Sequence, residues 1–247
     1  MKIVSLNIWG GRLHNELMDF YAKHQDVDIF CLQEVYANAH DKDKLFLDNT
    51  NFDSFLDTQK ALPLHTGYFF PHLEDWWGLA MFVNNNLEIQ EIGEKYVHLQ
   101  KGHNLEEEKK GYTAKNVQYL KTNSEDKPLT IVNFHGLWNG MGKEDSLDRI
   151  NQSKKIIEFL NSLTNDFVMC GDFNLSPETK SIHMIEQISG VRNLIKEFDI
   201  TSTRTSYYPK PNKFADYVFV SSGVSVNKFS VLDEEVSDHK VLLLDVA

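Results

Sequence analysis

Four strand-length apolar segments each end in a side chain whose chemistry is useful in a catalytic site. These side chains are an amide, two carboxylates and an imidazole: Asn7, Glu34, Asp172 and His135. Amide and carboxylate oxygens bind hard divalent cations, and an imidazole gives or takes a proton near neutral pH. Because ligands of α/β proteins gather outside the carboxyl ends of strands, we expect these side chains to converge on one site. Taken alone, each would more often be a polar residue that turns the chain.

Two short motifs add acidic side chains beside other useful groups. Asp172 and Asn174 stand two residues apart, ahead of a helix expected to begin near Pro177. This pair either caps that helix or serves the predicted site. Asp238 and His239 are adjacent, and a carboxylate beside an imidazole can bind a metal or handle a proton. An acid next to a histidine is common in loops, so this dipeptide matters only together with the other residues.

The elements that must position these residues follow from the hydrophobic pattern. Short apolar runs bounded by turn residues predict buried strands at 3–6, 27–32, 79–83, 129–134, 167–170, 217–220 and 241–244. Apolar residues at helical spacing predict helices near 13–24 and 147–160, the second with Asp145 or Ser146 as its N-cap. Strands that alternate with helices predict an α/β protein whose sheets are covered by helices.

Some connections are too short to contain a crossover helix. Residues 79–92 and 216–232 each hold two predicted strands with only a few residues between them, so we expect two β-hairpins and mixed sheets. Segment 98–113 is the most polar part of the chain and is expected to be a solvated loop.

Composition limits the class of protein. The chain has 247 residues, 41% hydrophobic and 25% charged, which predicts one globular domain over residues 1–247. Lys and Arg total 25 against 36 Asp and Glu, giving a net charge of −11. This charge argues against an architectural nucleic-acid binder, although an enzyme can carry the needed positive charge on a bound metal.

The cysteines and the apolar runs bear on the compartment. Cys31 and Cys170 lie inside apolar runs, as buried thiols do, and do not suggest a secreted disulfide framework. No run approaches the roughly 18 apolar residues that a membrane helix needs. We expect a monomeric, cytoplasmic protein without a transmembrane segment, with secretion left open if a leader has been removed.

Taken in order along the chain, the motifs resemble those of the endonuclease/exonuclease/phosphatase superfamily. The resemblance rests on Asn7, Leu32-Gln33-Glu34, His135, Gly171-Asp172-Phe173-Asn174, segment 215–221 with Asp216, and Ser237-Asp238-His239. It implies an α/β (α+β) fold, a four-layered sandwich of two mixed β-sheets packed face to face with helices outside. It also implies a metal-dependent hydrolase of phosphate esters that uses Mg²⁺, with Mn²⁺ as the alternative ion.

The resemblance implies roles for individual residues. It makes Glu34 the main metal ligand, with Asn7 and Asp238 completing or orienting the metal shell. Asp172 would orient or deprotonate the attacking water, and Asn174 would hold that water or a phosphate oxygen. These assignments agree with the oxygen ligands that phosphoryl transfer needs.

The remaining implied roles concern the phosphate and the rest of the substrate. His239, supported by Asp216, would face the phosphoryl oxygens, and His135 would contact the phosphate or the leaving oxygen. Three further side chains are expected to contact substrate: Trp9, Trp138 and Arg204. The alternative for the two tryptophans is that they only anchor loops by packing.

Two departures leave the substrate class open. Nucleases similar to exonuclease III carry a second Asn or Asp where this chain has Trp9, and Thr-Lys where it has Val35-Tyr36. Leu-Gln-Glu-Val more closely resembles the deadenylase, sphingomyelinase and phosphatase-like branches. The substrate is therefore a phosphate ester of a nucleic acid, a lipid headgroup or a small molecule. The alternatives are a small-molecule or phosphoinositide phosphatase of the same fold and a non-catalytic binding module. An unrelated α/β hydrolase would need a Gly-x-Ser-x-Gly motif, which the chain lacks.

Overall fold

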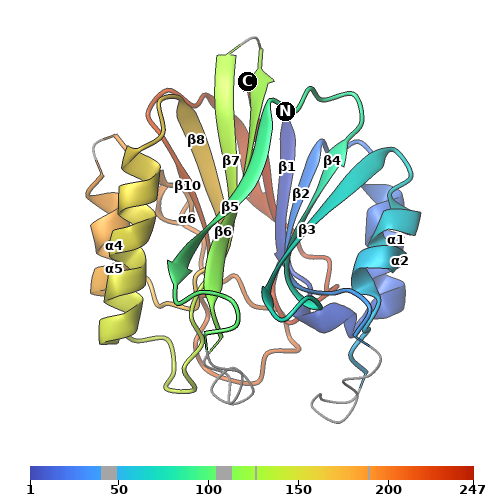
Figure 1. Cartoon of the computed structure of the whole chain (residues 1–247), viewed down its shortest axis with the longest axis horizontal. Helices are drawn as coiled ribbons and strands as arrows, with labels where there is room; N and C mark the ends of the chain where they lie inside the picture. Colours follow the sequence, from blue (N-terminus) through green and yellow to red (C-terminus); the bar gives the residue numbers. More distant parts are fainter. Residues whose placement is uncertain (40–48, 104–112, 126, 189) are drawn as a thin grey trace.

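Two β-sheets packed face to face form the centre of the molecule, and helices cover their outer faces (Figure 1). The computed structural model describes residues 1–247 except 40–48, 104–112, 126 and 189. Within these residues each sheet has six strands and mixes parallel with antiparallel pairs. The predicted four-layered α/β sandwich is confirmed. No described helix is long and apolar enough to cross a membrane.

The first sheet has the strand order β11-β12-β1-β2-β4-β3. Its strands are β1 (Lys2–Asn7), β2 (Ile29–Tyr36), β3 (His65–Leu73), β4 (Trp77–Asn84), β11 (Val226–Val231) and β12 (Leu242–Val246). The second sheet has the order β5-β6-β7-β8-β10-β9. Its strands are β5 (Glu91–His98), β6 (Lys115–Ser124), β7 (Lys127–His135), β8 (Asp166–Asp172), β9 (Arg192–Asn193) and β10 (Asp216–Val220).

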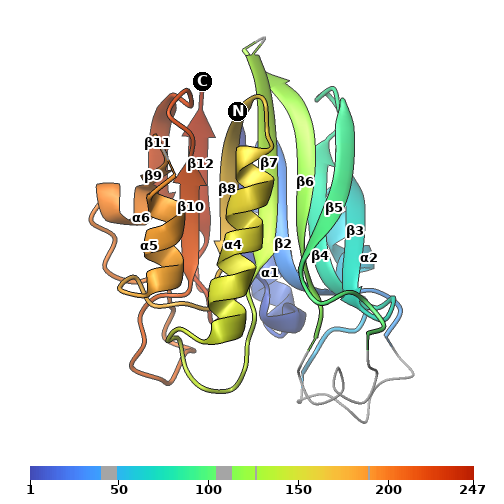
Figure 2. The ribbon, with the colours of Figure 1, turned by 60° about the vertical axis from the view of Figure 1, so that its left-hand side comes forward.

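The helices cover the outer faces of the sheets because successive strand residues point to opposite faces, and apolar residues lie on both. Val4 and Leu6 pack in one apolar cluster with Phe20 of α1 (His14–Lys23), whereas Ile3 and Ile29 belong to the core that includes residues of the second sheet. Helix α2 (Ser54–Ala61) lies beside α1, and α4 (Leu147–Asn161) and α5 (Lys180–Glu186) lie side by side over the second sheet (Figure 2). The short elements are η1 (Trp9–Gly11) and α6 (Leu194–Glu197).

Both predicted hairpins are wrong. β4 belongs to the first sheet and β5 to the second, and β10 and β11 are likewise in different sheets. Residues 85–90 and 221–225 therefore carry the chain across the sandwich. A few extended residues are enough to span the roughly 10 Å between stacked sheets. A short connection therefore excludes a crossover helix, but it can join two strands of the same sheet or strands of the two facing sheets.

The predicted helix starts agree better with the structure than the predicted hairpins do. Ser146 is the N-cap of α4, where its side chain accepts a hydrogen bond from the Arg149 backbone N–H. The helix expected near Pro177 begins at Lys180, with Thr179 as its N-cap. Most of the predicted loop 98–113 lies outside the described residues.

A layer of polar side chains joins the two sheets near the carboxyl ends of β2 and β7. The Gln33 amide donates to Asn133 Oδ1 at 2.7 Å, and Asn133 donates to the carbonyl oxygens of Leu32 and Ala80 at 3.0 and 3.2 Å. Gln33 and Asn133 are fully buried. Because these hydrogen bonds join β2 and β4 to β7, they fix how the two sheets align at this end.

Candidate active site

The strand registers bring the predicted residues to one end of the sandwich, opposite the chain termini (Figure 1). In the second sheet His135 pairs with Asp172, and Asp172 pairs with Asp216. Asn7 ends β1 of the facing sheet, and its Nδ2 donates to Asp172 Oδ2 and to Glu34 Oε1, each at 3.0 Å. One amide thus joins the carboxylates of the two sheets.

Glu34 reaches the site through an irregularity in β2. The pairing of β2 with β4 shifts register between Leu32 and Val35, and Glu34 has a left-handed backbone with φ of 57°. In a regular strand Glu34 would point to the face opposite Gln33. The bulge turns the carboxylate toward Asn7, and bulges of this kind are common beside active sites.

His239 is held by Asp216. Its Nδ1 lies 2.8 and 2.9 Å from the two carboxylate oxygens of Asp216, and its Nε2 lies 3.6 Å from Asp172 Oδ2. Burial alone would lower the pKa of His239, but the Asp216 and Asp172 carboxylates outweigh it and raise that pKa. His239 is therefore favoured as a cation.

His135 has the opposite charge preference. Its Nε2 lies 3.8 Å from Glu34 Oε1 and 3.9 Å from Asp172 Oδ2, yet burial and the nearby Lys115 ammonium hold its pKa well below the usual value. Its Nδ1 is buried and accepts or donates no hydrogen bond among the described residues. One end of the sandwich thus holds a cationic and a neutral imidazole, the division of charge that acid–base chemistry uses.

The two central carboxylates also differ. Burial alone would raise the pKa of Asp172, but the Lys143 and His239 charges together lower it below the usual range, so this carboxylate is ionised. Burial raises the pKa of Glu34, and the Asn7 hydrogen bond only partly offsets this.

The donor set fits a hard divalent cation. Ligand atoms of Glu34, His135 and Asp172 lie within 4.8 Å of one another, and so do those of Asp172, Asp216 and His239. Oδ1 of Asp238 is buried without a hydrogen-bond partner in the described part of the chain, 3.7 Å from His239 Nε2. Mg²⁺ and Mn²⁺ prefer oxygen ligands, and this end of the sandwich offers several carboxylate oxygens, one of them without a hydrogen-bond partner among the described residues.

Of the three expected substrate contacts, Trp9 and Arg204 are hydrogen-bonded to residues of this site and Trp138 lies beside Lys143. Trp9 follows Asn7, donates its backbone N–H to Asn7 Oδ1 at 2.9 Å and lies under the Arg12 guanidinium. Trp138 is 38% exposed, with Lys143 5.3 Å and Lys210 5.4 Å from its ring centre.

Arg204, the third expected contact, is buried and already engaged. Its Nη1 donates to Asp238 Oδ2 at 3.0 Å, and its guanidinium stacks 4.0 Å over the Tyr208 ring. The structure thus places Arg204 against a carboxylate of the site.

Several further side chains at the site were not predicted from the sequence pattern. His72 and Lys115 are buried beside Trp77, and the His72 and Trp77 rings pack against His135. Burial lowers the pKa of Lys115 to about 8. Lys143, in the loop after β7, donates from Nζ to Asn174 Oδ1. Nothing in the pattern marks a lysine for burial, because charged residues are seldom inside a protein.

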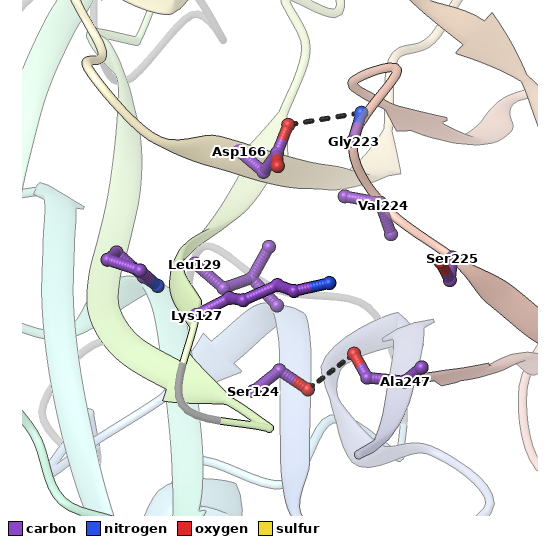
Figure 3. Close-up of a pocket in the computed structure, with 9 residues that line it drawn as sticks. Ser124, Lys127, Leu129, Asp166, Gly223, Val224, Ser225 and Ala247 are labelled. Atoms are coloured by element: carbon purple, nitrogen blue, oxygen red, sulfur yellow. Dashed lines mark hydrogen bonds between the residues drawn. The ribbon is translucent and has the colours of Figure 1, made fainter.

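A small pocket lies at the other end of the sandwich, beside the C-terminal Ala247 (Figure 3). The Asp166 carboxylate in this pocket already accepts hydrogen bonds from Ser221 and from the Gly223 backbone, and the Ser124 hydroxyl donates to the Ala247 carbonyl oxygen. The pocket brings together no set of groups comparable to that at the strand ends.

Comparison with solved structures agrees with this fold. A mannosyl-6-phosphatase from Bacteroides thetaiotaomicron has a TM-score of 0.74 at 14% identity, over 100% of this chain and 99% of that one. TDP2 from D. rerio, solved with a single strand DNA product, has a TM-score of 0.72 at 14% identity, over 100% and 98%. The human Nocturnin catalytic domain, solved with a sulfate anion, has a TM-score of 0.69 at 18% identity, over 100% and 93%.

At these identities the likeness shows a shared fold. No curated protein sequence matches the chain. The model of one family, however, matches residues 4–239, which include every motif residue gathered at the strand ends. The chain therefore belongs to the Endonuclease/Exonuclease/phosphatase family.

Proposed function

We propose that this chain is a divalent-metal-dependent phosphoesterase, in which water attacks phosphorus in line with the leaving oxygen. Members of the family are hydrolases that act on phosphate esters. The observation that carries the proposal is the position of Asp172. An ionised, buried carboxylate meets Asn7 from the facing sheet and lies within 4 Å of two imidazoles of opposite charge preference.

In this proposal Glu34 and Asp238 hold Mg²⁺ or Mn²⁺, and Asn7 orients the ligands through its hydrogen bond to Glu34. When bound, such an ion offsets the charge that develops on the phosphoryl oxygens. Among the described residues Oδ1 of Asp238 has no competing hydrogen bond, because Arg204 donates only to Oδ2.

Asp172 orients the attacking water and accepts its proton. The Asn174 backbone N–H donates to Asp172 Oδ1 at 2.7 Å, which leaves Oδ2 to face the histidines, and the Asn174 side chain holds a phosphate oxygen. An ionised carboxylate whose position is fixed on both sides is suited to this task.

The two histidines contact the phosphoryl group. Asp216 accepts the Nδ1 proton of His239, so Nε2–H is directed toward the phosphoryl oxygens as a hydrogen-bond donor. His135, which is neutral, contacts the phosphate or the leaving oxygen through Nε2. Trp9, Trp138 and Arg204 border the substrate.

The net charge of −11 favours a small phosphate ester over a long nucleic acid as substrate. The two candidate activities are phosphodiester hydrolysis of nucleic acid or headgroups and small-molecule monoester hydrolysis. Both are kept because a mannosyl-6-phosphatase and TDP2, which was solved with a single strand DNA product, share this fold. We also propose a monomeric single domain in the cytoplasm, in keeping with the unpaired Cys31 and Cys170.

The test is a hydrolysis screen with Mg²⁺ or with EDTA. The substrates are p-nitrophenyl phosphate, bis(p-nitrophenyl) phosphate, hexose phosphates, phosphoinositides, sphingomyelin, RNA and single-stranded DNA. We expect turnover only with metal, and Asp172→Asn should lower it by roughly 10² to 10⁴ while the melting temperature stays close to wild type. Full activity in EDTA, or in Asp172→Asn, would contradict the proposed function.

A further inference from the structure

Lys143 is a buried cation that has no carboxylate partner among the described residues. The residue is 3% exposed, and its Nζ donates a hydrogen bond to the neutral amide oxygen Oδ1 of Asn174. The structure shows no ion pair between Lys143 and any described carboxylate. Burial is costly for an ammonium, and it lowers the pKa of Lys143 even though Asp172 and Asp216 act in the other direction. A cost of this kind at the edge of a catalytic site points to a function.

The loop that carries Lys143, residues 136–146, is held in place from both sides. The Arg149 guanidinium donates to three of its carbonyl oxygens, those of Leu137, Gly142 and Glu144. On the other side the Gly136 N–H donates to the Asp172 carbonyl at 2.6 Å, and the Ser176 N–H donates to the Lys143 carbonyl at 2.9 Å. The ammonium is therefore positioned before any substrate arrives, as electrostatic catalysis requires.

Most charged groups around Lys143 belong to the site. Lys143 is the nearby cation that most lowers the pKa of Asp172, and its other charged neighbours are Arg204, Asp216 and Arg149. The Trp138 ring, 38% exposed, lies 5.3 Å from Nζ. Lys143 is thus a neighbour of both the central carboxylate and a partly exposed ring.

Among the described residues each of the four arginines already contacts another group of the protein, and in Arg204 the buried Nε is without a hydrogen-bond partner. Arg204 is paired with Asp238, Arg149 with loop carbonyls and Arg192 with Glu197, while Arg12 lies over Trp9. An ammonium has three N–H donors, and Asn174 takes one of those of Lys143. No other hydrogen bond of this ammonium is found among the described residues, which leaves two donors for a ligand.

We propose that Lys143 is a catalytic residue whose ammonium binds the nonbridging oxygens of the substrate phosphate and stabilises their charge during phosphoryl transfer. This inference rests on the proposed function and specifies its substrate as a terminal phosphate group. A monoester carries about two negative charges near neutral pH and a diester carries one, so an extra fixed cation favours the monoester.

The experiment compares Lys143→Met, Lys143→Gln and Lys143→Arg with Lys210→Met, which removes an exposed ammonium from the same Trp138 ring. Turnover of p-nitrophenyl phosphate and bis(p-nitrophenyl) phosphate is measured with Mg²⁺. We expect Lys143→Met and Lys143→Gln to lower kcat/KM for the monoester by roughly 10² to 10³, and for the diester by less. Lys143→Arg should retain more activity than either, and Lys210→Met should stay within about twofold of wild type.

Binding of inorganic phosphate, followed by calorimetry with Mg²⁺, gives a readout without turnover. Lys143→Met should weaken it roughly tenfold or more, because a charge-assisted contact is lost. If Lys143→Met does not fold, Lys143→Gln and Lys143→Arg carry the comparison.

Equal losses in Lys143→Met and Lys210→Met, or unchanged turnover and phosphate affinity in Lys143→Met, would overturn the inference. A wild-type protein that hydrolyses none of the substrates of the screen would instead refute the proposed function, and the phosphate-binding comparison would still decide the role of Lys143.

Discussion

Asp172 shows how one residue acquires its chemistry from its neighbours. Its burial alone would favour the neutral acid, yet Lys143 and His239 keep the carboxylate ionised. Glu34 lies close by with fewer cations around it, and burial raises its pKa. A carboxylate that burial disfavours as an anion gains most from a bound cation, which makes Glu34 the best residue for testing the metal site.

Glu34→Gln should weaken Mg²⁺ binding and activity together, because it replaces a charged oxygen ligand with a neutral one. We expect Mg²⁺ affinity, measured by calorimetry, to fall roughly tenfold or more. Without metal the variant should melt no lower than wild type, since a carboxylate disfavoured by burial has been removed. The exposed Glu158→Gln on α4 is the control. A wild-type Mg²⁺ titration in Glu34→Gln would remove Glu34 from the metal site.

At the scale of elements, short irregular segments do the positioning that regular strands cannot. The bulge in β2 turns Glu34 toward the site, and the loop 136–146 carries Lys143 and Trp138 beside it. This loop depends on Arg149, a buried residue at the start of α4.

Arg149→Lys should therefore destabilise the protein and loosen this loop in particular. A lysine cannot reproduce the fork of hydrogen bonds to Leu137, Gly142 and Glu144, so carbonyl oxygens are left unpaired at a cost of roughly 2 to 4 kcal/mol in unfolding free energy. Hydrogen exchange should speed up across residues 137–145. Arg192→Lys, which alters a surface pair with Glu197, should cost less than about 1 kcal/mol. Equal costs in the two variants would show that the loop does not rely on Arg149.

Across the whole molecule, the interface between the sheets is polar at the site end and holds neutral imidazoles. Burial and the Lys115 charge hold the pKa of His72 well below its usual value, and burial does the same for His135. Below about pH 6.5 the unfolded chain binds a proton at each of these positions that the folded chain does not. Stability is therefore lost as the pH falls. The raised pKa of His239 has the opposite sign, and its contribution is lost as the pH rises.

His72→Gln should reduce this sensitivity to acid. Urea unfolding in EDTA between pH 8 and pH 5 measures this sensitivity. Below pH 6 the unfolding free energy should fall less steeply with pH in the variant than in wild type, by up to about 1.4 kcal/mol per pH unit. Glutamine can still bond to Asn116, the partner of His72 Nδ1, so the fold should be kept. A slope equal to that of wild type would mean that His72 is protonated in the folded protein.

Features that depend on local pattern could be predicted from the amino-acid order alone: the buried strands β1, β2, β4, β7, β8, β10 and β12, the helices α1 and α4, and the motif residues at the strand ends. Apolar runs and caps act through near neighbours, so they are visible in the chain. Which strands face each other depends on contacts between distant segments, and both expected hairpins instead cross the sandwich. The tertiary structure also buries Asn116, Gln118, Lys115 and Lys143. Polar residues like these look exposed in a sequence, because the partners that make their burial affordable come from the facing sheet or from a distant loop.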